Sequence, residues 1–124
     1  MAVPKYKLYI GGEWRASHKK ETFFSKNPAT EERIAEFEKA SVEDARAAID
    51  AAEGAFSKWQ DVPAPKRAKV IYNAARILEQ EKERLALVVA KEMGKVLAES
   101  RGDVQEAIDM AYYMAGEGRR LFGH

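Results

Sequence analysis

The pattern of hydrophobic and polar residues has a period of two at the start of the chain. Tyr6, Leu8 and Ile10 would lie on one face of a β-strand, with the residues between them on the other face. Gly11-Gly12 follows, and two glycines readily adopt the positive φ angles of a tight hairpin turn. The pattern therefore predicts that residues 13–15 form the returning strand of a hairpin.

A second pair of strands is predicted before residue 39. Residues 22–25 are rich in strand-favouring side chains, and residues 27–30 are typical of a turn. Pro28 fixes its own φ angle and disfavours helical geometry at the residue before it. Residues 33–38 would then form a strand, with Ala35 and Phe37 facing inward.

The period becomes helical at Ser41. Ser41 and Asp44 have the spacing of a capping box, in which the hydroxyl accepts from the amide three residues on and the carboxylate accepts from the Ser41 amide. Pro63 and Pro65 indicate that this helix ends near Gln60. Its apolar stripe is mostly alanine, so we expect close packing against a neighbour; the stripe consists of Ala45, Ala48, Ile49, Ala52, Phe56 and Trp59.

Two further helices are predicted after Pro65, which suits the first turn of a helix. The polar stretch 79–83 predicts a bend or break between them, and Gly94 predicts a left-handed helix stop. The predicted buried face of the first is Val70, Ile71, Ala74, Ile77 and Leu78. The predicted buried face of the second is Leu85, Val88, Val89 and Met93.

The last predicted helix runs from Val96 to Phe122 and is the element around which we expect the others to pack. Its apolar stripe is formed by Leu97, Val104, Ile108, Ala111 and Ala115, with Tyr112 beside it. The shorter helices supply only part of the cover that such a stripe needs. We therefore expect an α+β fragment, with β-hairpins in residues 1–40 and three or four helices in residues 41–124, whose remaining cover lies outside the chain.

The composition excludes several classes of function. The chain is 46% hydrophobic and 33% charged, with no apolar run long enough to cross a bilayer and no basic-then-apolar leader, so we expect a cytoplasmic protein. A net charge of +1 provides no field that would attract nucleic acid or a membrane surface. The absence of cysteine excludes a disulfide, a thiolate metal site and a cysteine nucleophile in these residues. The scarcity of Asn and Gln favours a heat-adapted source.

The short motifs indicate no chemistry by themselves. His18 and His124 have no acidic or histidine partner at ligand spacing. Residues 116–118 imitate part of a dinucleotide-binding motif, but they end a helix and the third glycine position is Leu121. We interpret the many carboxylates of residues 79–109 as solvated helix faces, and Tyr112-Tyr113 as packing residues.

Several segments, in their order, resemble the amino-terminal quarter of the aldehyde dehydrogenase superfamily. They are residues 9–14 (YIGGEW), 27–32 (NPATEE) with 34–35, 40–41 with 43–44 and 48–52 (AIDAA), 55–56 with 59, 66–68 (KRA), 92–95 (EMGK), and Asp103 with Tyr112-Tyr113. No single segment is specific. Together they cover nearly the whole chain.

The resemblance implies an enzyme that oxidises an aldehyde to an acid with NAD or NADP. Members of this family use a cysteine nucleophile, a glutamate general base and an oxyanion hole made by an asparagine and a backbone amide. All of these groups lie downstream of the matched region, which belongs to the Rossmann-like cofactor-binding domain. We therefore assign no catalytic or cofactor-binding residue, and we expect the chain alone to be inactive and to bind no NAD(P).

The resemblance also implies one metal site and a substrate class. Some members bind a monovalent cation near the Asn-Pro turn, and the matching positions are Ser25, Lys26 and Asp103. Residues 117–123 resemble enzymes that act on lactaldehyde or on semialdehydes. We expect a homo-oligomer, because uncovered apolar helix faces from residue 85 onward favour association. The alternatives are a free-standing helical interaction module and an unrelated α+β domain.

Overall fold

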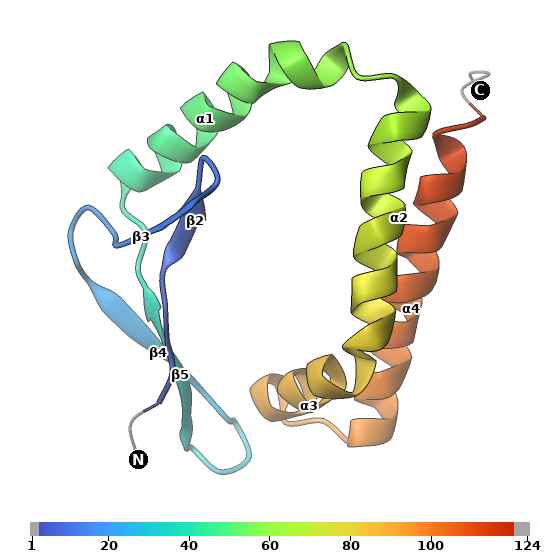
Figure 1. The fold of residues 1–124 in the computed structure, drawn as a ribbon. Coiled ribbons are helices and arrows are strands. Elements are labelled where there is room, and N and C mark those ends of the chain that lie inside the picture. The colour runs from blue at the N-terminus through green and yellow to red at the C-terminus, as the bar shows by residue number, and fades with distance from the viewer. Residues whose placement is uncertain (1–2, 121–124) are drawn as a thin grey trace. The chain divides into compact units, whose positions relative to one another are not determined.

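The computed structural model describes residues 3–120, which divide into two compact units after Gln60 (Figure 1). The first, which we call the strand unit, holds five short strands and one helix in the part that the structure describes, residues 3–60. The second, the helical unit, holds three helices within the described residues 61–120. The predicted α+β class, with strands followed by helices, is confirmed.

The strands form one three-stranded sheet and one hairpin. The sheet has the order β1-β5-β4, with β1 parallel and β4 antiparallel to β5, and the hairpin pairs β2 with β3. The strands are β1 (Lys5–Tyr6), β2 (Leu8–Ile10), β3 (Glu13–Arg15), β4 (Thr22–Lys26) and β5 (Arg33–Glu38). Both predicted hairpins are present.

The single strand expected at the start of the chain is split at Lys7. Tyr6 pairs with Phe37 in the sheet, whereas Leu8 pairs with Arg15 in the hairpin. The rings of Tyr6 and Phe37 stack with centroids 5.3 Å apart, and this contact favours the pairing of β1 with β5. A period-two pattern cannot show that a strand changes partner.

The turns before and after the strands follow the sequence expectations. Gly11 and Gly12 have φ angles of 62° and 88°. In the turn after β4, the Asn27 side-chain oxygen accepts from the Ala29 amide at 2.9 Å. Ala35 is buried in β5 and Phe37 is half-buried, as predicted.

Helix α1 (Val42–Gln60) begins with the predicted capping box. The Asp44 amide donates to Ser41 Oγ at 3.3 Å, and the Ser41 amide donates to Asp44 Oδ2 at 2.9 Å. Ala48 and Ala52 of the predicted alanine stripe line a groove together with the β2–β3 hairpin, whereas Ile49 and Phe56 on the same stripe are exposed. Close packing of the whole stripe stays a prediction. Within its unit the helix contacts strand β2 of the hairpin.

The helical unit contains α2 (Ala64–Gln80), α3 (Lys82–Met93) and α4 (Leu97–Glu117). Helices α2 and α4 lie side by side in opposite directions (Figure 1). The predicted break between α2 and α3 is confirmed at Glu81, which has φ −95° and ψ 6°. The predicted left-handed stop is confirmed at Gly94, with φ 68°.

Helix α4 ends at Glu117, earlier than the predicted end at Phe122. Gly116 and Gly118 lie at this end, and glycine lowers the stability of a helix by about 1 kcal/mol relative to alanine. The Arg119 and Arg120 amides donate to the carbonyls three residues before them, which makes the final turn tighter than an α-helix. Leu121 and Phe122 lie outside the described residues.

The core of the helical unit is centred on α4, as predicted. Its buried members are Ala86, Val104 and Ile108, of which the last two belong to the predicted stripe. Partly buried residues packed around them are Leu78, Leu85, Val89, Leu97 and Tyr112. Of the face predicted for α3, Leu85 and Val89 contact this core, whereas Val88 and Met93 are exposed and Ala86 takes the central position.

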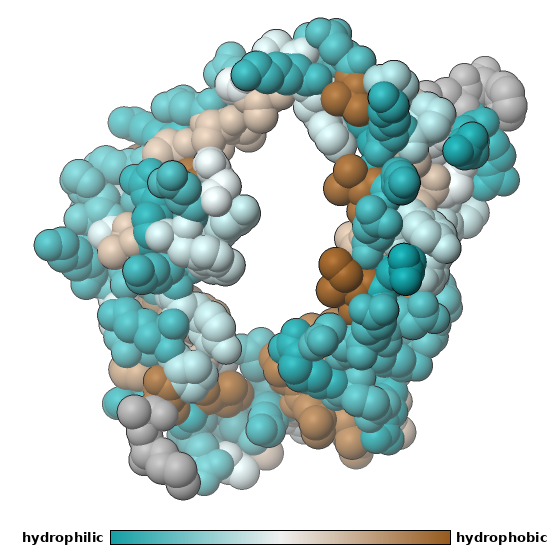
Figure 2. All heavy atoms as spheres, viewed as in Figure 1, coloured by the Kyte–Doolittle hydropathy of each residue, from teal (hydrophilic) through white to brown (hydrophobic). Residues whose placement is uncertain are grey.

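The buried face predicted for α2 is largely wrong. Ala68 and Ala75 are buried, whereas Val70, Ile71 and Ile77 are exposed, and Figure 2 shows hydrophobic surface along α2. The physical reason is close approach, because small side chains let the α4 backbone come near the axis of α2. Helix α2 therefore has two apolar faces: an alanine face against α4, and an aliphatic face, made of Val70, Ile71, Ala74 and Ile77, that is exposed.

None of the helices among residues 3–120 has the length and apolar character needed to cross a bilayer.

Candidate functional site

Two residues of the predicted cation site lie in the strand unit. Ser25 and Lys26 are the last residues of β4, where the pairing with β5 changes register between Ser25 and Lys26. The Lys26 ammonium lies 3.8 Å from the carboxylate of Glu31. A change of register of this kind marks an irregular pairing of the two strands.

The third residue of that site, Asp103, lies in the helical unit on the outside of α4. Its carboxylate accepts a hydrogen bond from the Lys95 ammonium, and this bond raises the pKa of Lys95. A cation that took Asp103 as a ligand would have to replace Lys95. The three residues belong to different units, and the cation site stays a prediction.

A cluster of buried polar groups joins the elements of the strand unit. Ser17, Glu38 and Asp44 are all buried, although they come from a loop, the end of β5 and the start of α1. The Ser17 amide donates to Glu38 Oε2 at 3.0 Å, and the His18 amide donates to both Asp44 oxygens at 3.1 Å. Lys5 from β1 lies 3.5 Å from Glu38 Oε1.

Backbone donors hold the Asp44 carboxylate in its charged form. The hydrogen bond from the Ser41 amide, assisted by the one from the His18 amide, lowers the pKa of Asp44 from 3.8 to about 2. All of these contacts fix the backbone at the start of α1. We interpret the cluster as structural, and the capping-box pattern of the sequence signalled only its Ser41–Asp44 part.

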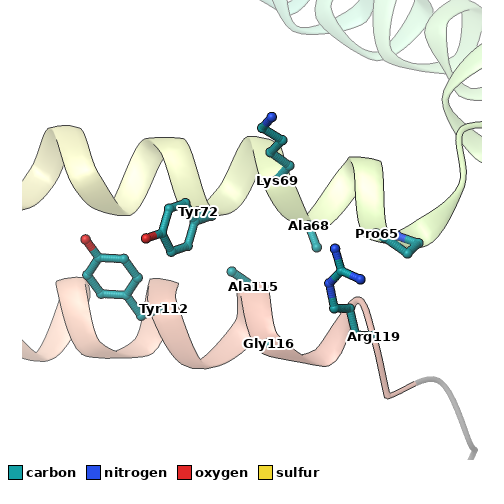
Figure 3. Close-up of a pocket in the computed structure, with 8 residues that line it drawn as sticks. All are labelled: Pro65, Ala68, Lys69, Tyr72, Tyr112, Ala115, Gly116 and Arg119. Carbon is teal, nitrogen blue, oxygen red and sulfur yellow. The ribbon is translucent and has the colours of Figure 1, made fainter.

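A groove of about 380 Å³ lies between α2 and α4 in the helical unit. Figure 3 shows its residues, which are Pro65, Ala68, Lys69 and Tyr72 from α2, and Tyr112, Ala115, Gly116 and Arg119 from α4 and the turn after it. The two tyrosine rings meet edge to face with centroids 5.4 Å apart. The Tyr112 hydroxyl donates to Glu79 at 2.8 Å, and this bond raises the pKa of Tyr112.

The predicted packing role of the tyrosine pair holds for one member. Tyr112 is half-buried and contacts the core, whereas Tyr113 is exposed. The groove itself was missed by sequence reasoning. The only feature of the sequence that pointed to it is the presence of small side chains on both α2 and α4. The apolar period of each helix does not show that these side chains face each other.

Several carboxylates of the helical unit pair with basic or polar groups. Glu83 accepts two hydrogen bonds from Arg101 Nε and one from Arg101 Nη2, at 2.9 to 3.1 Å, and these bonds lower the pKa of Glu83. Within residues 3–120, no three side chains of His, Cys, Asp or Glu converge as metal ligands would.

Gly116 and Gly118 do not form the glycine-rich turn of a dinucleotide-binding motif. Phosphates of such cofactors bind at a helix N-terminus that follows a strand and a glycine-rich turn. Gly116 and Gly118 instead lie at the C-terminal end of α4, where carbonyl groups point outward.

Comparison with known proteins gives the family. The profile of the "Aldehyde dehydrogenase family" matches residues 14–124. The chain belongs to the aldehyde dehydrogenase family. It is 41% identical to malonate-semialdehyde dehydrogenase 1 of Geobacillus kaustophilus and 38% identical to D-glyceraldehyde dehydrogenase (NADP(+)) of Picrophilus torridus. Each match covers 94% of this chain and 24% of the relative, so the chain spans about a quarter of these relatives.

The fold of the chain is also that of aldehyde dehydrogenases. A crystal structure of an NAD-dependent aldehyde dehydrogenase from Sinorhizobium meliloti is similar, with a TM-score of 0.92 and 27% identity. The match covers 99% of this chain and 25% of that one. The strands and helices described above are therefore those of one quarter of an aldehyde dehydrogenase chain.

Proposed function

We propose that this chain is the amino-terminal segment of an NAD(P)-dependent aldehyde dehydrogenase that oxidises a small aldehyde, either lactaldehyde or a semialdehyde, to its acid. In this proposal residues 1–40 form the β-hairpin region and residues 41–124 the helical region. The observation that carries the proposal is the family match over residues 14–124, combined with coverage of about a quarter of each relative. The names of the relatives favour semialdehydes and other small aldehydes.

The proposed activity belongs to the longer enzyme. Oxidation of an aldehyde through a thioester needs a nucleophilic thiolate, and the chain contains no cysteine. NAD or NADP would accept the hydride in the parent enzyme, since one relative is named for NADP(+) and one structure for NAD. The contribution of this chain is a packed scaffold, with α4 and its core at the centre.

Further parts of the proposal concern the setting of the parent enzyme. We expect a cytoplasmic homo-oligomer, and a monovalent cation held by the carbonyls of Ser25 and Lys26 together with the Asp103 carboxylate. Asp103→Asn in the parent enzyme should weaken any stimulation by potassium or sodium. Asp109→Asn, on the same helix, is the matched control, and equal effects of the two changes would contradict the cation site.

A chimera tests the proposed function directly. Residues 14–120 of this chain would replace the matching segment of the Geobacillus enzyme, and NAD(P)H absorbance would be followed with malonate semialdehyde, lactaldehyde and glyceraldehyde. We expect the chimera to fold and to turn over at least one of these aldehydes, because the replaced segment is a scaffold of the same fold. A folded chimera without turnover would contradict the proposal.

The isolated chain is the second arm of the experiment. We expect it to show no aldehyde-dependent reduction of NAD or NADP. Turnover that persisted through further purification and scaled with the amount of chain would contradict the assignment of all chemistry to the longer enzyme. An inactive chimera together with a tight protein partner for the isolated chain would favour the interaction-module alternative.

A further inference from the structure

Helix α3 leaves the direction of α2 at a bend (Figure 1), although the residues at the bend favour a continuous helix. Residues 79–83, which we call the hinge, read Glu-Gln-Glu-Lys-Glu and contain neither glycine nor proline. All three residue types are among the better helix formers. The polar run interrupts the apolar pattern of the helices, but it does not oppose helical geometry. The bend therefore needs a cause outside the hinge.

The departure from helical geometry is centred on Glu81. This residue has φ −95° and ψ 6°, whereas an α-helix has φ of about −63° and ψ of about −42°. Helical hydrogen bonds continue on both sides, because the Glu81 amide donates to the Ile77 carbonyl at 3.0 Å and the Leu85 amide donates to the Glu81 carbonyl at 2.9 Å. The amides of residues 82–84, as the first of a helix, have no partner within it. Rotation at Glu81 would join residues 64–93 into one helix and give these amides helical partners.

Contacts with α4 on both sides of Glu81 hold the bend. Before it, the Tyr112 hydroxyl donates a hydrogen bond to the Glu79 carboxylate at 2.8 Å. After it, the Lys82 ammonium donates to Gln105 Oε1 at 2.7 Å. Apolar residues of α3 pack against the core of α4 next to this bond. Tertiary contacts, and not the residues of the hinge, therefore make α2 and α3 diverge.

These contacts would respond differently if the hinge became straight. Helix α3 is joined to α4 by the short turn 94–96 and by the apolar core, so α3 and α4 would move together. Helix α2 would separate from α4 and expose Ala68 and Ala75, which are now buried. The rings of Tyr72 and Tyr112, now 5.4 Å apart, would also separate. One opened chain would lose these contacts, whereas two opened chains offer each other the same two surfaces.

We propose that the hinge allows this chain to form a domain-swapped dimer, in which α2 and α3 of each copy form one continuous helix and α2 of one copy packs against α4 of the other. Such an exchange of identical elements closes the assembly with two-fold symmetry, so that it stops at two chains. The partner is a second copy of the chain, and each copy supplies both halves of the α2–α4 contact. The proposal concerns the chain by itself and does not depend on the proposed dehydrogenase function.

Size-exclusion chromatography with light scattering, applied to the whole chain refolded at a series of concentrations, detects the dimer. We expect a dimer that forms at high concentration and returns slowly to monomer on dilution, because exchange requires the helical unit to open. In NMR spectra of the two forms, amide shifts should differ around the hinge and agree in the core of α4. In a dimer made from two differently labelled samples, NOEs between Tyr72 and Tyr112 should connect the two copies.

Two substitutions of the same hinge residue should have different effects on the dimer. Glu81→Gly lowers the helix propensity of both hinges and should raise the dissociation constant of the dimer about tenfold. Glu81→Ala also removes the carboxylate that pairs with Arg84, but alanine favours a helix, so this dimer should be at least as stable as the unchanged one. Asn73→Gly is the matched control, because this exposed position in α2 is helical in both forms and its change should leave the dissociation constant unaltered. Circular dichroism checks that each variant is folded.

Three results would overturn the proposal. A chain that stayed monomeric after refolding at every concentration would show that the hinge does not open. A dimer with NOEs between Tyr72 and Tyr112 only within each copy would show a different interface. A dimer that Ile77→Lys dissociated and Glu81→Gly left unchanged would show association through the exposed aliphatic face of α2.

Discussion

The contrast between two isoleucines gives the sharpest test of the helical unit. Ile108 on α4 is 1% exposed in the core, whereas Ile77 on α2 is 59% exposed. Both lie within helices, so truncation changes the helix propensity of the two positions by the same amount. The difference between the two truncations therefore measures burial within this chain.

The expected magnitudes follow from the carbon atoms removed. Ile108→Val should lower the free energy of unfolding by about 0.5–1.5 kcal/mol, and Ile108→Ala by about 2–5 kcal/mol, because a cavity remains beside Val104 and Ala86. Ile77→Ala should change it by less than about 0.5 kcal/mol, as is usual for a surface position. In a unit of this size 1 kcal/mol corresponds to roughly 4–8 °C in melting temperature.

Thermal and urea unfolding of the chain, followed by circular dichroism of the helices, provide the measurement. The Ile108→Val variant matters most, because Ile108→Ala can remove most of the stability of a unit this small. Hydrogen exchange of α4 amides gives a second, local readout. If Ile77→Ala destabilised the chain as much as Ile108→Ala, the assignment of the α2 aliphatic face as uncovered would be wrong.

Three further predictions concern other positions. Gly118→Ala should lower the melting temperature, because its new methyl group would overlap Ala68, and adding Ala68→Gly should recover part of this loss. Unfolding experiments in which the two changes simply add would contradict this contact. Because its folded-state pKa is depressed, the Asp44 carboxyl should titrate near pH 2 by NMR, and its contribution to stability, present above pH 3.8, should be lost as the pH falls through about 2. A titration near pH 3.8 would contradict the backbone hydrogen bonds. Light scattering should show concentration-dependent association of the chain, reduced by Phe56→Lys and Ile77→Lys, which charge exposed apolar faces; a monomer at all concentrations would contradict it.

The sequence alone determined the local structure of this protein. The capping box at Ser41 and Asp44, the left-handed stop at Gly94 and the hairpin turn at Gly11-Gly12 all depend on residues close in the chain. The break at Glu81 and the buried stripe of α4 were also predicted, since a run of polar residues and a strong apolar period leave few alternatives. The family resemblance came from the same short segments.

The tertiary structure decided which apolar face of each helix is buried. In α2 the sequence offers an alanine face and a larger aliphatic face, and hydrophobicity alone favours the second. The structure buries the first, because Ala68 and Ala75 let α4 approach closely. The α2–α4 groove, the partner change at Lys7 and the buried Ser17–Glu38–Asp44 cluster also join residues distant in the chain. Periodicity reports which residues share a face of one element, and only packing determines what that face contacts.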